Sequence, residues 1–82
     1  MDRKRLNGEL VRMIRHSRRL KQIEFAARIG ITQAMLSFIE NGLRELNEVT
    51  EGRIRQQFSI DEKAIDCLSV ASEVAKGKRE ER

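Results

Sequence analysis

Residues 20–42 read LKQIEFAARIGITQAMLSFIENG, and this stretch determines what fold the chain can adopt. Apolar residues recur at helical spacing over residues 22–29 and again over residues 33–40. Between the two runs, Gly30 suits the left-handed conformation that commonly ends a helix. Thr32 then offers a hydroxyl to cap the second run. The stretch therefore predicts two short helices joined by a tight turn.

The rest of the chain also has helical patterning. We expect further helices at residues 3–18, 51–58 and 62–76, because apolar side chains recur there three and four positions apart. Thr50 and Asp61 are the expected N-caps of the last two. No segment shows the alternation of a strand. The prediction is an all-α, compact five-helix fold.

The chain has 82 residues, which is enough for one small domain. We expect residues 1–60 to form its main body. Residues 61–76 are expected to form a C-terminal helix that serves packing or dimerisation, and residues 77–82 a frayed polar tail.

Positive charge is concentrated at the N-terminal end of the chain. The net charge is +4, and residues 1–22 hold eight Lys or Arg against two acidic residues. A basic lobe of this kind favours a polyanionic partner, although charge alone would equally serve solubility. The single Cys67 lies in an apolar run, so we expect a buried thiol, with a redox or intermolecular role as the alternative.

Several classes of protein have no support in the sequence. No run approaches the roughly 18 apolar residues of a membrane span, and no apolar segment follows the basic start as in a secretory signal. No set of acidic, histidine or cysteine residues suggests a catalytic or metal site. We therefore expect a cytoplasmic protein that is not an enzyme and needs no cofactor or metal.

The segment of residues 20–42 has the layout of a helix-turn-helix, in which the second helix enters the major groove of DNA. Leu36 and Ile39 would hold that helix from behind. Gln22, at the start of the preceding helix, could contact a phosphate. Glutamine can bond two edge atoms of adenine, and apolar groups can touch a thymine methyl. The side chains expected to face outward are Gln33, Ala34, Met35, Ser37 and Phe38.

The same residues resemble the DNA-binding segment of the Cro/C1-type repressors, the Xre family. The resemblance covers about residues 7–60. It rests on a register of matching positions: Gln22, Ala26, Gly30, Ile39, Glu40, Asn41 and Gly42. It implies a lambda-repressor-like five-helix domain that binds operator DNA, a double-stranded site, as a homodimer. Family members contact phosphates or bases through positions that match Gln22, Thr32, Gln33, Ala34, Phe38, Asn41 and Arg44.

The resemblance also implies a structural ion pair between Arg15 and Glu40. This chain departs from the family pattern at Lys21, where a Ser or Thr usually caps the helix, so that cap is either missing or supplied by another group. Phe38 stands where polar residues are common; it either touches thymine methyls or packs on a neighbouring side chain. Met35 also has two alternatives, a contact in the DNA groove or packing in the protein core.

The C-terminal helix carries more apolar surface than one side of a small domain needs. We expect part of it to meet a second copy of the chain, with the alternative that it all packs within its own chain. The expected interface residues are Ile65, Leu68, Ala71 and Val74.

Together these observations predict a transcriptional regulator, a repressor of the phage or mobile-element kind that binds an inverted-repeat operator. An antirepressor or other protein partner would be one way to relieve repression. The alternatives are an antitoxin or a restriction-modification controller with the same fold, or a protein-interaction module with a vestigial helix-turn-helix.

Overall fold

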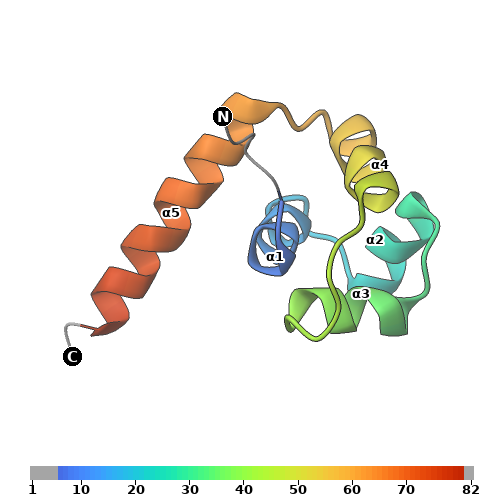
Figure 1. Cartoon of the computed structure of the whole chain (residues 1–82), viewed down its shortest axis with the longest axis horizontal. Coiled ribbons are helices and arrows are strands. Elements are labelled where there is room, and N and C mark those ends of the chain that lie inside the picture. Colours follow the sequence, from blue (N-terminus) through green and yellow to red (C-terminus); the bar gives the residue numbers. More distant parts are fainter. Residues whose placement is uncertain (1–5, 81–82) are drawn as a thin grey trace.

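The computed structural model describes residues 6–80, and the side chains of residues 6–71. This part of the chain holds five helices and no strand, as the sequence predicted. The helices are α1 (Gly8–Ser17), α2 (Gln22–Ile29), α3 (Gln33–Glu40), α4 (Glu48–Phe58) and α5 (Glu62–Glu80). In Figure 1, α2, α3 and α4 lie on one side of α1, and α5 lies on the other side and runs away from the body.

The core is built from the inner faces of α1 to α4. Val11, Phe25, Leu36 and Ile54, one from each helix, have no exposed surface. The rings of Phe25 and Phe58 are stacked with their centroids 4.7 Å apart, which fixes α2 against α4. Each apolar side chain so buried contributes about 1.5–3 kcal/mol by leaving water, and this burial holds the four short helices together.

The two helices of the quoted segment begin and end where the sequence predicted. Gly30 ends α2 with a φ of 75°, a left-handed conformation, and Thr32 Oγ1 accepts from Met35 N at the start of α3. Lys21 provides no side-chain cap, so the cap itself is missing, and the start of α2 is held instead by Glu24 Oε1, which accepts from Lys21 N at 2.8 Å.

Two helix starts differ from the prediction. α1 begins at Gly8, because Asn7 Oδ1 accepts from Leu10 N and caps it there, and residues 3–5 of the predicted helix lie outside the described residues. The preceding Leu6 is nevertheless buried in the core. α4 begins three residues early, because Asn47 rather than Thr50 is its N-cap. Both departures follow from an asparagine that competes well for the cap position.

The C-terminal boundaries also differ. α5 continues through Gly77 to Glu80, past the expected boundary at residue 76. The predicted polar tail at residues 77–82 is thus helical over most of its length, and residues 81–82 lie outside the described chain. The first turns of α5 pack on α1, with Ile65 in the core.

Candidate nucleic-acid interface

The inner face of α3 is held firmly by the core. Leu36 is fully buried and Ile39 is 4% exposed. Thr32 caps the N-terminus of the helix, and the Gly42 amide donates to Ile39 O just beyond its C-terminus. Because packing and both ends fix α3, its outer side chains are presented from a rigid support.

The outer flank of α3 is open to solvent. Thr32, Gln33 and Ala34 are exposed, and Phe38 keeps 46% of its surface exposed. Ser37 is half-buried. At this exposure Phe38 can be reached by a groove, and packing on a neighbouring side chain stays the alternative. Met35 is half-buried, between the two positions that the sequence left open.

Arg15 and Glu40 join α1 to the C-terminal end of α3. Arg15 Nε donates to Glu40 Oε2 at 2.7 Å, and Arg15 Nη2 donates to Glu40 Oε1 at 3.0 Å. The Glu40 side chain is fully buried and the Arg15 side chain is 13% exposed. Gln22 Nε2 also donates to Glu40 Oε1, at 3.1 Å, so α2 is tied to the same carboxylate. The three helices of the site thus meet at one buried charge.

The electrostatics of this cluster keep Glu40 ionised. Burial alone would raise the pKa of Glu40, but hydrogen bonds from Arg15 and Gln22 and the positive charges of Arg15 and Arg12 outweigh burial. The net result is a pKa below the ordinary value of 4.5. The carboxylate is therefore charged at neutral pH and can accept all three hydrogen bonds.

Arg12 is a positioning residue that the sequence analysis missed. Its Nη2 donates to Asn41 Oδ1 at 3.0 Å and to Glu40 O at 3.4 Å, at the end of α3. Asn41 Nδ2 in turn donates to Ser37 O at 2.9 Å. The sequence signal was the helical spacing of Arg12 and Arg15, three positions apart, which places two arginines on one side of α1.

The loop after α3 is fastened to it by the backbone. The amides of Leu43 and Arg44 both donate to Phe38 O, at 2.8 and 3.3 Å. This leaves the Arg44 side chain exposed, together with Asn41 and 71% of Leu43. Asn41 and Arg44 therefore lie next to the exposed flank of α3, on the segment that leaves it.

The residues expected at the dimer interface differ in their burial within the single chain. Ile65 is 1% exposed within a single chain and belongs to the core, so its expected place at an interface was wrong. Leu68 is half-buried and packs against the core, and Ala71 is exposed. The side chain of Val74 lies outside the described residues. Cys67 is exposed rather than buried, because its side of α5 does not face α1.

Among the described residues, no three histidine, cysteine or acidic side chains are placed to hold a metal ion. No helix in this part of the chain has the length and apolar character that crossing a membrane requires.

Comparison with known proteins agrees with this geometry. Residues 11–50 match the helix-turn-helix family, which covers α1 from its second turn through α2 and α3 to the start of α4. Comparisons with curated proteins and with solved structures gave no match. The matched residues contain the turn at Gly30, the exposed flank of α3 and the cluster at Glu40. Residues 11–50 are thus a helix-turn-helix of the Cro/C1 type, a segment whose family model supports binding to double-stranded DNA.

Proposed function

We propose that the protein is a sequence-specific transcriptional repressor that inserts α3 into the major groove of its operator. The observation that carries this proposal is the combination found on α3. Its inner face is buried through Leu36 and Ile39, whereas Gln33, Ala34 and Phe38 are exposed. Gln33 would read an adenine edge, and Ala34 and Phe38 would touch thymine methyls.

Contacts to the DNA backbone would come from residues around α3. Thr32 and Asn41 lie at its two ends, and Arg44 follows on the exposed loop. Gln22 donates one N–H to Glu40, and its amide has a second N–H that could reach a phosphate. Such contacts position the protein and make its affinity fall steeply with salt.

We infer that the repressor acts as a homodimer joined through α5. Of the side chains described just beyond Leu68, two apolar ones are not covered by their own chain: Ala71 is exposed and Val70 keeps 64% of its surface exposed. Figure 1 shows α5 diverging from α1 in this direction. A two-fold pair would place two copies of α3 about 34 Å apart, one turn of DNA, so the operator would be an inverted repeat. This arrangement is of the kind found in phage and mobile-element repressors.

Footprinting on the DNA that flanks the protein's own gene tests the proposal. We expect protection of two half-sites related by two-fold symmetry, with their centres one helical turn apart. A duplex of equal length and shuffled sequence is the control, and it should be protected only at much higher protein concentration. Equal protection of both duplexes, or none at low ionic strength, would rule out a sequence-specific regulator.

The direction of regulation needs a separate measurement. A reporter gene placed behind the footprinted site should be expressed less when the protein is present. Increased expression from the same site would show an activator and would contradict the repressor assignment.

A further inference from the structure

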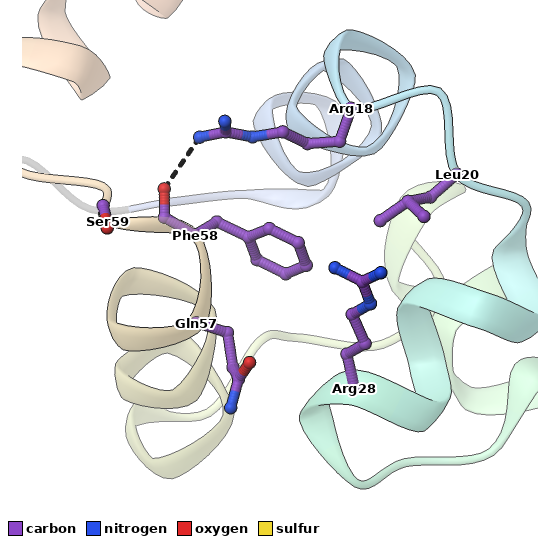
Figure 2. A pocket seen from close by; sticks show the side chains of 6 residues that line it. All are labelled: Arg18, Leu20, Arg28, Gln57, Phe58 and Ser59. Carbon is purple, nitrogen blue, oxygen red and sulfur yellow. Dashed lines mark hydrogen bonds between the residues drawn. The ribbon is translucent and has the colours of Figure 1, made fainter.

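A pocket lies on the side of the domain formed by α1, α2 and α4. Its volume is about 350 Å³, which falls in the range of small-molecule sites. Figure 2 shows its lining, which comes from the residues that follow α1, from α2, and from the end of α4 and the residue after it. The lining residues are Arg18, Leu20, Arg28, Gln57, Phe58 and Ser59. None belongs to α3, so the pocket is separate from the flank proposed to read bases.

The pocket is positively charged and not neutralised. It is lined by two arginines and by no acidic residue. Arg18 is held in place, because its Nη2 donates to Phe58 O at 2.7 Å, and its guanidinium has further N–H groups. Arg28 is exposed and makes no hydrogen bond or ion pair with any described residue. Two cations at one concave surface repel each other and attract an anion.

The same pocket has an apolar part. In Figure 2, Arg28 extends toward the space between Leu20 and the ring of Phe58. The Phe58 ring is fixed by its stacking on Phe25, and the Arg18 guanidinium carbon lies 6.0 Å from its centroid. Leu20 is half-buried and packs against the core. An apolar wall next to a guanidinium without a partner among the described residues suits a ligand that has both an apolar body and a negative charge.

We propose that this pocket binds a small organic carboxylate with an apolar, planar body. The Arg28 guanidinium would hold the carboxylate through paired N–H···O bonds. The body would lie against Leu20 and the Phe58 edge, with the Gln57 amide at the rim. Such a ligand would connect α1, α2 and α4 and would leave α3 free.

Nuclear magnetic resonance titration of the full chain with benzoate tests the proposal. We expect saturable shifts confined to the amides of residues 18–20, 28 and 57–59, with a dissociation constant of about 1 mM or below. Acetate, which lacks the body, and benzamide, which lacks the charge, should each bind at least about tenfold more weakly. Equal binding of acetate and benzoate would show mere attraction of anions and would overturn the proposal.

Variants separate the pocket from the general positive charge of the domain. R28Q should weaken benzoate binding about tenfold or more and leave the fold intact, because Arg28 is exposed and makes no hydrogen bond within the described chain. R44Q removes an equal charge from an exposed position outside the pocket and should leave benzoate binding unchanged. Shifts that do not saturate, or an equal loss in the two variants, would contradict a site at Arg28.

Discussion

Arg15 of α1 and Glu40 of α3 form a buried ion pair with two hydrogen bonds, of 2.7 and 3.0 Å, although 25 positions separate them in the chain. The pair lies directly behind the C-terminal end of the proposed recognition helix. Its carboxylate also accepts from Gln22 at the start of α2. One side chain therefore fixes the relative positions of the three helices that make up the site.

Replacing Glu40 by glutamine should destabilise the domain strongly at pH 7. The variant leaves the Arg15 guanidinium, which is 13% exposed, without its counter-charge, and breaking a buried pair in this way costs about 3 kcal/mol. Chemical denaturation measures the loss. E24Q is a suitable comparison, because Glu24 is exposed and its one hydrogen bond among the described residues is accepted from the Lys21 amide. If E40Q lost no more stability than E24Q, the pair would have no structural role.

The contribution of Glu40 should also depend on pH in a defined direction. Its pKa is lowered in the folded protein, so the stabilisation is present above the unfolded value of about 4.5 and is lost as pH falls through the folded value. The stability difference between wild type and E40Q should therefore narrow below about pH 4.5. Thermal unfolding from pH 7 to pH 3 measures this difference. A constant gap over that range would contradict the assigned pKa direction.

Two glycines in helices should respond oppositely to alanine. A Cβ at Gly8 would overlap the carbonyl oxygen of Ile39, where α1 crosses the end of α3. G8A should therefore destabilise the domain by about 1–3 kcal/mol. A Cβ at Gly52 meets nothing within 4 Å, so G52A should stabilise by about 0.5–1 kcal/mol through its better helix propensity. Denaturation midpoints compare the two. A stable G8A would mean that the two helices are not in close contact.

Gln33 is the expected base reader on α3. Q33A should weaken binding to the footprinted operator by about 1–3 kcal/mol and leave binding to random duplex nearly unchanged. Fluorescence anisotropy with both duplexes at one salt concentration gives the two values. Q56A, which removes the same side chain from the exposed face of α4, should change neither. Equal loss on operator and random DNA would show that Gln33 does not read bases.

Ala71 should lie in the proposed dimer interface. Introducing a charge there with A71E should convert the dimer to a monomer, because the charge would be buried between two copies of α5. The domain itself should stay folded, since Ala71 is exposed in the single chain. Analytical ultracentrifugation measures the mass, and Q56E provides a charge change on α4. If the wild-type chain stayed monomeric at high concentration, the proposal that α5 forms a dimer interface would be wrong.

The sequence by itself determined the helix-turn-helix. The bounds of α2 and α3 depend on local signals, namely apolar spacing, the turn at Gly30 and the cap at Thr32. Each of these signals involves residues within about four positions of one another, so it can be recognised in the sequence without the tertiary structure. The same spacing predicted that Gln33, Ala34 and Phe38 are exposed, because helical periodicity separates the two faces, whereas Met35 and Ser37 are half-buried at the border between them.

The tertiary structure decided everything that depends on residues distant in the chain. Leu6 is buried and its amide donates to Glu51 Oε2 at 3.1 Å, 45 positions away, which no local pattern shows. Arg12 donates a hydrogen bond to Asn41 because α1 crosses the end of α3. The apolar stripe of α5 was visible in the sequence, but which part of it faces the core depends on how α5 packs on α1. Ile65 is buried in the core whereas Ala71, on the same helix, is exposed. Periodicity shows which side of a helix is apolar, but burial depends on which residues lie close in three dimensions.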